Sequence, residues 1–423
     1  MTVTLIKNLA SLTGAEILSK GVTFAAFAYV ARIFGPAGFG YIEWSAAILM
    51  CASLIVDQGF NAYGAREIAR EPGRTEHLLS EIVTARFLLA LIGYLAIAAF
   101  AFVFVQDAQV FKLLLVYGLS LWALPLLLQW VFQGHDRMNV VALTQIIRQL
   151  TFAGVVLLLV RRADDLLIVG FAEVAGVSVA AGFSVWMYKR HIHRRLNLSP
   201  TLSIKLFKEG VPIGISQMFW VVRMFGATLI LGLVATAEDI GYFAGALRIL
   251  IALHTFVWLY YFNLFPSMSR SWMAGTEEFS GLIRNSIRLV GVASILIGIV
   301  WVALAPMLTV IAYGHDFVRS GPALQWMAGV WIAAAISGHY RFGLIAAGFQ
   351  NKEMISSAVG AATAIIFVPV GYVNAGLGGA AAALFVAEVL VLLSSWYFAR
   401  GSWEPGPSNQ IDRRVEVLQE VVR

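Results

Sequence analysis

The chain has 423 residues, of which 60% are hydrophobic and only 13% are charged, and its mean hydropathy is +0.80. Soluble domains contain about 45–50% apolar and about 25% charged residues. The polar surface is therefore too small for a water-soluble body of 46.1 kDa, and the composition indicates a polytopic membrane protein. The net charge of +6 suits contact with anionic lipid. It does not indicate a nucleic-acid partner, because the basic residues lie between apolar segments.

The predicted elements are membrane-spanning helices, each of which needs about 20 mostly apolar residues. Several apolar segments exceed 25 residues, which predicts tilted or kinked helices. Pro125 lies within the fourth segment, where the lost backbone hydrogen bond permits bending. The twelve predicted spans cover residues 8–33, 39–65, 78–105, 110–133, 139–160, 165–188, 207–235, 240–267, 282–312, 320–349, 354–373 and 378–399.

Lysine and arginine are distributed unevenly between the two sets of connections. Nineteen fall on the set that includes both termini, and five fall on the other set. The positive-inside rule therefore predicts that both termini are cytoplasmic. The outer connections are short, such as residues 35–38 and 374–377, so the sequence predicts no outer catalytic domain.

The longest inner loop falls at the middle of the chain and divides the spans into six plus six. Gly40-Tyr41 recurs as Gly241-Tyr242, an offset of 201 residues, which predicts a parallel internal repeat. Transporters built in this way bind substrate near the midplane between their halves. The predicted organisation is a six-helix bundle over 1–188, a basic cytoplasmic linker over 189–206, a second six-helix bundle over 207–400 and an amphipathic cytoplasmic tail over 401–423.

Charged residues inside the predicted spans are the strongest functional signal, because they mark a transport pathway or a buried pair. Six basic and five acidic residues are nearly balanced, so mutual pairing is the structural alternative to a functional role. These residues are Lys20, Arg86, Arg148, Arg223, Arg248, Arg341, Glu16, Glu43, Asp57, Glu173 and Glu388.

The first span carries a polar stripe. Thr13, Glu16, Lys20 and Thr23 lie on one helical face, which predicts that this face points into the bundle. Lys20 falls near the midplane, and the repeat offset takes it to within two residues of Arg223. The two first helices of the halves are therefore expected to direct cations toward a shared axis.

The predicted site is a cationic central cavity for an anionic ligand, most simply a phosphate or diphosphate. Lys20, Arg223 and Arg248 are its principal candidates, and Arg148 and Arg341 are further candidates. Arginine supplies forked donors that match the oxygens of such a ligand. The alternative is that each cation pairs only with a neighbouring carboxylate, as Lys20 could with a glutamate one turn away.

Three further residues have candidate roles. Trp220 lies one turn before Arg223 and could stack on a sugar ring, whereas Glu16 and Asp57 could bind a coupling proton or sodium ion. Structural pairing is the favoured interpretation of both carboxylates. The single cysteine, Cys51, excludes disulfides, and the sequence has no P-loop and no His/Glu metal motif. No metal and no cofactor other than a coupling ion is expected.

The first seventy residues carry motifs whose order and spacing resemble the polysaccharide-export (Wzx-type flippase) family of the multidrug/oligosaccharidyl-lipid/polysaccharide (MOP) superfamily. The fourth span resembles the family pattern at Trp130, Gln133-Gly134 and Arg137. The resemblance implies that Arg32, Asp57 and Arg66 are structural and hold the ends of the first two spans. The motifs are Lys7-Asn8, Gly21, Arg32-Ile33-Phe34-Gly35-Pro36, Gly38-Phe39-Gly40-Tyr41, Asp57-Gln58-Gly59 and Arg66-Glu67-Ile68-Ala69.

The resemblance implies a MATE-like fold of two six-helix bundles around a central cavity. It also implies a flippase that moves undecaprenyl-diphosphate-linked oligosaccharide from the cytoplasmic to the periplasmic leaflet of the bacterial inner membrane, for O-antigen or exopolysaccharide synthesis. Lys20, Arg223 and Arg248 would meet the diphosphate while the lipid tail stays in the bilayer. A polysaccharide polymerase and a chain-length regulator are the partners that the resemblance implies.

Three alternatives stay open at this point. A cation-coupled multidrug antiporter of the same superfamily is expected to have a net acidic cavity, which the midplane cations disfavour. A membrane polysaccharide polymerase or ligase usually has a large periplasmic loop, whereas the outer connections here are short. A flippase for the peptidoglycan precursor is expected to have more than twelve spans. The sequence therefore favours a transporter over an enzyme.

Overall fold

The computed structural model describes residues 2–192 and 202–403, and every regular element within these ranges is helical. Within these ranges, eight helical segments are long and apolar enough to cross a membrane. The all-α membrane architecture is therefore confirmed, whereas the count of twelve spans and the cytoplasmic termini stay predictions. Most of the predicted tail, from residue 404 onward, lies outside the described ranges.

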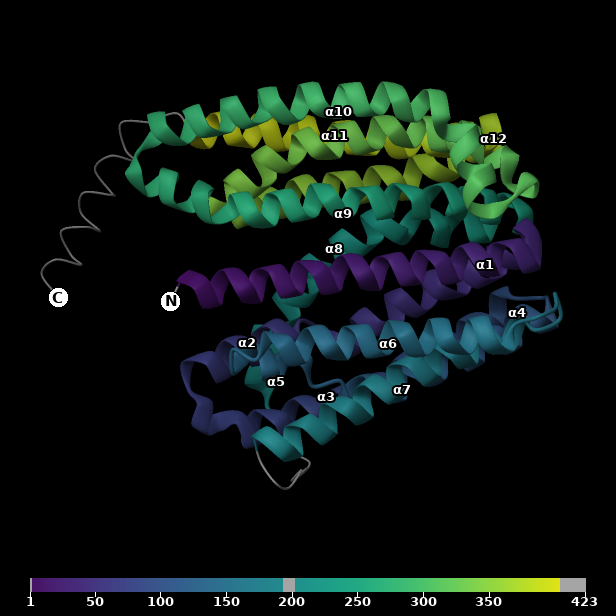
Figure 1. The fold of residues 1–423 in the computed structure, drawn as a ribbon, viewed down its shortest axis with the longest axis horizontal. Helices are drawn as coiled ribbons and strands as arrows, with labels where there is room; N and C mark the ends of the chain where they lie inside the picture. Colours follow the sequence, from purple (N-terminus) through teal and green to yellow (C-terminus); the bar gives the residue numbers. More distant parts are fainter. Residues whose placement is uncertain (1, 193–201, 404–423) are drawn as a thin grey trace, which may run out of the picture.

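The α-helices run lengthwise beside one another (Figure 1). Short 3-10 helices η1 (Pro72–Arg74), η2 (Ser120–Trp122), η3 (Leu124–Leu126) and η4 (His315–Ser320) connect some of them. The α-helices are α1 (Thr2–Asp57), α2 (Phe60–Arg70), α3 (Thr75–Phe104), α4 (Ala108–Leu119), α5 (Gln129–Gly134), α6 (Met138–Leu159), α7 (Leu166–His191), α8 (Ile204–Val234), α9 (Ala237–Ala274), α10 (Thr276–Tyr313), α11 (Gly321–Ala346) and α12 (Gln350–Trp403).

Two of the longest helices are interrupted at the predicted outer turns. Gly35 has φ 64° inside α1, and Ala375 and Gly376 leave helical geometry inside α12. Gly35 and Gly376 have positive φ, which glycine adopts at little cost because it lacks Cβ. Each interruption divides one long helix into two segments at the point where the sequence predicted a connection.

The fourth predicted span differs from its prediction, because it is not one continuous helix. α4 ends at Leu119, and two 3-10 turns lead to the short helix α5. Pro125 lies at the start of η3, where a residue without an N–H group ends regular helical pairing. The break occurs beside a cavity described below, which Leu124 and Leu127 line.

The helices form two groups, and α1 lies where the two groups meet. We call α1–α7 the N-terminal group and α8–α12 the C-terminal group. α1 packs against α6 within its own group and against α8 and α9 of the other. Figure 1 shows α9 to α12 on one side of α1, and α2 to α7 on the other. The assignment of these groups as separate six-helix bundles with the predicted boundaries stays a prediction.

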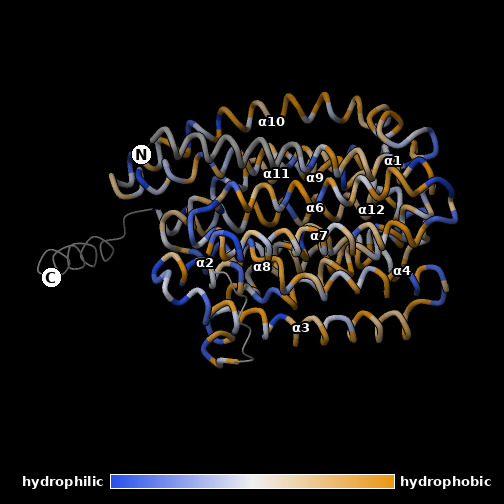
Figure 2. The backbone as a smooth tube through the Cα atoms, turned by 60° about the horizontal axis from the view of Figure 1, so that its bottom comes forward, coloured by the Kyte–Doolittle hydropathy of each residue, from blue (hydrophilic) through white to orange (hydrophobic). Residues whose placement is uncertain are grey.

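The periphery of the molecule is apolar. Figure 2 shows α3 and α10 at opposite edges, with hydrophobic residues along most of their length. Phe102 on α3 is 83% exposed and Leu289 on α10 is 71% exposed. Such continuous exposed apolar surface is unfavourable in water, and lipid is the environment that it fits.

The two groups meet in backbone contact at the internal repeat. Gly40 on α1 packs against Gly241 on α9, and the two glycines are the repeat-related pair. A Cβ at Gly40 would lie 2.0 Å from the carbonyl oxygen of Ala237, and one at Gly241 would lie 1.9 Å from that of Pro36. Only glycine permits this approach, so the two residues mark one place where the groups touch.

A second close contact joins the groups just after the C-terminal end of α1. A Cβ at Gly59 would lie 2.6 Å from the carbonyl oxygen of Gly210 on α8. Phe60 packs edge-on against Phe207, with ring centroids 5.6 Å apart. Contacts between the groups therefore occur on both sides of the region that contains the predicted site.

Candidate functional site

A cavity of about 520 Å³ lies between the two helix groups. α1, α6 and α7 form one wall, and α8 and α9 form the other. Three of the predicted cations, Lys20, Arg148 and Arg248, line it. The remaining polar lining residues are Ser19, Thr23, Glu43, Gln145, Gln149, Glu173 and Thr228. We call this space the central cavity.

Arg248 connects the two walls of the central cavity. It extends from α9 and forms an ion pair with Glu43 on α1. Its guanidinium carbon also lies 3.2 Å from the centroid of the Phe27 ring. A planar guanidinium stacks on an aromatic face and still offers donors at its edge. Arg248 is therefore held in place with its side chain still 20% exposed.

Lys20 makes a second contact between the groups. Its ammonium donates to the Thr255 hydroxyl on α9 at 3.1 Å. Thr23, one turn further along α1, donates to Gln149 on α6 at 2.8 Å. Lys20 and Thr23 both line the central cavity, so the polar stripe points into the bundle over its described part. The side chain of Glu16 lies outside the part of the chain whose side chains are described.

Arg148 belongs to the N-terminal group alone. It lies on α6 and pairs with Glu173 on α7 at 2.6 Å. Its side chain is 33% exposed, more than those of the other arginines paired within spans. Glu173 and Glu43 were not assigned to the site from the sequence, although their position inside spans marked both as charges that need a partner.

The described lining of the central cavity has a small positive excess. Three basic side chains, Lys20, Arg148 and Arg248, face two carboxylates, Glu43 and Glu173. Each carboxylate already pairs with an arginine. An anionic ligand would thus meet hydrogen-bond donors whose positive charge is partly neutralised by the paired carboxylates. This arrangement suits reversible binding of an anion better than binding of a cation.

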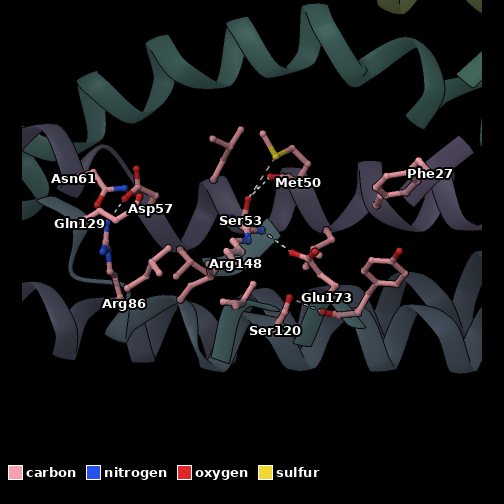
Figure 3. A pocket seen from close by; sticks show the side chains of 18 residues that line it. Phe27, Met50, Ser53, Asp57, Asn61, Arg86, Ser120, Gln129, Arg148 and Glu173 are labelled. Carbon is pink, nitrogen blue, oxygen red and sulfur yellow. Dashed lines mark hydrogen bonds and ion pairs between the residues drawn. The ribbon is translucent and has the colours of Figure 1, made fainter. Parts of the chain in front are cut away.

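A second, smaller cavity lies beside the first, within the N-terminal group (Figure 3). Its volume is about 380 Å³, and Phe27, Ala46, Met50, Arg148 and Glu173 line both spaces. All of its lining residues lie between Phe27 and Val177, in α1 to α7 and the turns that join them, and we call it the N-terminal chamber.

Asp57 and Arg86 lie at the far end of the N-terminal chamber and form an ion pair. The Arg86 side chain is 3% exposed and that of Asp57 is 20% exposed. This pairing agrees with the structural interpretation favoured for Asp57 from the sequence. A role of Asp57 or Glu16 in ion coupling stays a prediction.

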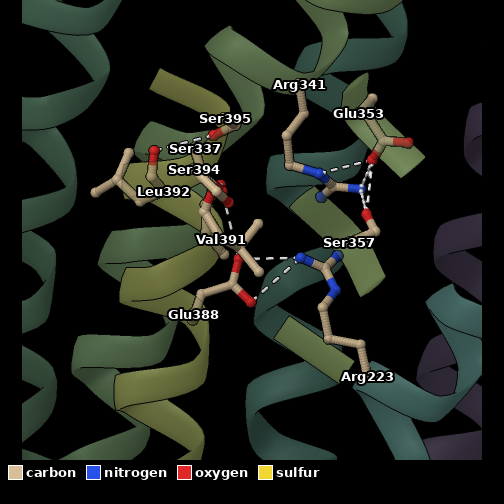
Figure 4. A network of polar contacts seen from close by, with 11 residues as sticks. Arg223, Ser337, Arg341, Glu353, Ser357, Glu388, Val391, Leu392, Ser394 and Ser395 are labelled. Carbon is tan, nitrogen blue, oxygen red and sulfur yellow. Dashed lines mark hydrogen bonds and ion pairs between the residues drawn. The ribbon is translucent and has the colours of Figure 1, made fainter. Parts of the chain in front are cut away.

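Arg223 and Arg341 do not line the central cavity in the described structure, which corrects the expectation that both belong to the cationic cavity and that Arg223 faces the shared axis. Figure 4 shows them in a separate cluster within the C-terminal group. Arg223 donates to both carboxylate oxygens of Glu388, at 3.2 and 3.3 Å, and both side chains are almost fully buried. Arg341 donates to Glu353 at 2.6 and 2.9 Å.

The repeat offset came within two residues of Arg223 along the helix, but it did not predict the direction in which the side chain points. A helix turns about 100° per residue, so a shift of two residues moves a side chain to another face. Arg223 therefore points toward α12, whereas Lys20 points toward the central cavity. The Trp220 side chain is outside the described part, so its predicted stacking on a sugar stays a prediction.

A family model described as "Polysaccharide biosynthesis protein" matches residues 5–272, which is more than half of the chain. The chain belongs to this family. The match includes both stretches on which the sequence resemblance rests. As a family member with eight helical segments suited to the bilayer, the chain is a multi-pass membrane protein.

Relatives and solved structures agree with this assignment. The chain is 26% identical to a Shigella dysenteriae protein named "Putative O-antigen transporter", over 88% of this chain and 93% of that protein. Its fold resembles an inward-facing MATE family transporter of the MOP superfamily, with a TM-score of 0.74 and 12% identity over 92% and 94% of the two chains. It also resembles the lipid II flippase MurJ, with a TM-score of 0.72 and 14% identity over 92% and 87%. The MATE-like fold of this family member is thus confirmed.

The motif residues of this family member join its helix groups. Arg32 on α1 donates to the carbonyl oxygens of Ile311 and Ala312 at the end of α10. Arg66 on α2 pairs with Glu209 on α8 at 2.7 Å. Both contacts cross from the N-terminal to the C-terminal group, so these arginines contribute to the interface rather than to the cavity lining.

Proposed function

We propose that this protein is a flippase that moves undecaprenyl-diphosphate-linked oligosaccharide repeat units across the membrane by alternating access. The observation that carries the proposal is the central cavity, where Arg248 and Lys20 present donors between the two helix groups. Membership of the polysaccharide biosynthesis family and the O-antigen transporter name of the relative support it. The protein acts as a transporter and not as an enzyme.

The ion pair between Arg248 and Glu43 suggests how an anionic ligand acts on the protein. A diphosphate that binds Arg248 competes with Glu43 for the same guanidinium donors. Because this pair joins α9 to α1, its exchange weakens a bond between the helix groups. Binding of the headgroup thereby favours separation of the groups, while the polyprenyl tail remains in lipid.

The proposal includes the topology and cellular setting predicted from the sequence. We infer twelve spans, cytoplasmic termini and insertion in the bacterial inner membrane, with a polymerase and a chain-length regulator as partners. Coupling to a proton or a sodium ion is proposed as an additional driving force, with no other cofactor. The likeness to MATE and MurJ structures supports the fold alone, since identities are 12–14%.

The test uses a strain that lacks the gene and carries either the wild-type protein or a variant. Arg248→Met keeps an unbranched apolar stem and removes the guanidinium with its charge. We expect it to abolish surface polysaccharide and to leave undecaprenyl-linked repeat units facing the cytoplasm. Arg270→Met is the matched control, because Arg270 is an exposed arginine of the same helix outside the cavity.

Two results would contradict the proposal. Full polysaccharide with Arg248→Met would show that the cavity cation is not needed. Intact polysaccharide together with sensitivity to cationic drugs in the deletion strain would favour a multidrug antiporter. A polymerase or ligase would instead leave repeat units that have already reached the periplasmic leaflet.

A further inference from the structure

The N-terminal chamber contains buried polar atoms that the protein leaves without hydrogen bonds. Among the described residues, no partner exists for the Tyr117 hydroxyl, the Arg86 Nε and the Asn61 Oδ1. All three residues line the chamber. Tyr117 is 2% exposed and Arg86 is 3% exposed, so bulk solvent does not satisfy them.

Such atoms are costly in a folded protein. Leaving a buried donor or acceptor unsatisfied costs about 1–3 kcal/mol, which is why native proteins pair nearly all of them. Here three occur in one space, and they include both donors and an acceptor. Their position together points to a bound group that can accept and donate hydrogen bonds.

The charges of the chamber indicate which kind of group this is. The four charged side chains on its wall form two ion pairs, between Asp57 and Arg86 and between Glu173 and Arg148. The chamber wall therefore has no net charge, in contrast to the positive excess of the central cavity. A neutral ligand rich in hydroxyl groups fits this wall better than a free ion does.

We propose that the N-terminal chamber is the sugar subsite of the transporter, which holds the first saccharide residues while the diphosphate binds in the central cavity. This inference rests on the proposed function. The two spaces adjoin at Arg148 and Glu173, which line both, and the proposed ligand spans them. A volume of about 380 Å³ lies within the range of small-ligand sites, about 300–1,000 Å³.

The location of the subsite has a mechanistic consequence. Because every lining residue comes from α1 to α7 or the turns that join them, the chamber should keep its shape when the helix groups move relative to each other. The sugar thus stays bound to the N-terminal group during the transition, while the diphosphate exchanges contacts at the interface. Ser53, Gln129 and Ser120 supply further polar groups to the same wall (Figure 3).

The experiment compares two probes on the full-length protein in nanodiscs: undecaprenyl diphosphate alone, and undecaprenyl diphosphate that carries one N-acetylglucosamine. We expect the wild type to bind the glycosylated probe more tightly. Tyr117→Phe removes only the unpartnered hydroxyl and should reduce this preference by about threefold to tenfold, as loss of one hydrogen bond does. Asn61→Leu should have a similar effect.

The control is Tyr188→Phe, which is the same substitution at a buried tyrosine of α7 outside the chamber, and it should not change the preference. If the preference survives in both Tyr117→Phe and Asn61→Leu, the chamber binds water only and the subsite is refuted, although the flippase proposal stands. If the wild type binds neither probe, the proposed function itself is refuted, and the subsite with it.

Discussion

The contact between Gly40 and Gly241 allows a prediction whose magnitude comes directly from the structure. In Gly40→Ala the new Cβ would lie 2.0 Å from the Ala237 carbonyl oxygen, whereas ordinary contact begins at 3.4 Å. α1 and α9 must therefore move apart by about 1.4 Å, the difference between these distances. The obstacle is backbone rather than a flexible side chain, so local adjustment cannot relieve it.

The energetic effect should be at the upper end of the range for overpacking, about 3 kcal/mol. A penalty of this size shifts the equilibrium between joined and separated helix groups by about a hundredfold. Under the proposed alternating access, this contact is lost and re-formed in every cycle, so we expect Gly40→Ala to reduce transport at least tenfold. The readouts are surface polysaccharide in complemented cells and lipid translocation in proteoliposomes.

Gly182→Ala is the matched control for this substitution. Gly182 lies on α7, where a Cβ meets no atom within 4 Å among the described residues. Alanine is favoured over glycine in a helix by about 1 kcal/mol, so this variant should fold and transport at least as well as the wild type. Wild-type transport by Gly40→Ala would refute the view that the glycine contact closes and re-forms.

Two further predictions concern the ion pairs. Glu43→Gln should increase the affinity for undecaprenyl diphosphate by about fivefold to tenfold in nanodisc binding, because the anion no longer competes with a carboxylate for Arg248; weaker binding would contradict this competition. Arg223→Met should destabilise the protein by about 3–5 kcal/mol, measured by thermal unfolding in detergent, because it leaves Glu388 buried without its partner. The double change to methionine at both positions should restore stability and transport, and a stable double variant without transport would give Arg223 a direct role.

Most of the architecture could be predicted from the sequence, because the bilayer imposes a simple pattern. Apolar length gave the positions of the helices, and glycine with neighbouring proline gave the interruption at Gly35. The broken fourth span was harder to predict. Pro125 permits a bend, but whether the helix continues beyond it depends on packing around the N-terminal chamber.

The site could be predicted only in part, for a different physical reason. Charge inside a span identifies a residue that needs a partner, and three of the residues it indicated, Lys20, Arg148 and Arg248, line the central cavity. It cannot distinguish a cation facing the cavity from one facing its own helix group, because that depends on rotation about the helix axis. Arg223 and Arg341 are also charged residues inside predicted spans, but they face partners within their own helix group.

The contacts between the helix groups differ in how they can respond to a ligand. Arg248 with Glu43, and Lys20 with Thr255, are polar contacts of cations that line the central cavity, where an anion can take the place of the protein acceptor. The backbone contact between Gly40 and Gly241 contains no polar partner that a ligand could replace, so it either persists or is lost as a whole.

Under the proposed function, the ligand therefore exchanges partners with Arg248 and Lys20 in the cavity. The contact between Gly40 and Gly241 is then kept or lost as a consequence. The ion pair of Arg223 with Glu388 lies wholly within the C-terminal group and crosses no moving interface. It should keep its geometry in every state of the transport cycle. Substitutions there should change the stability of the protein without changing which ligand it carries.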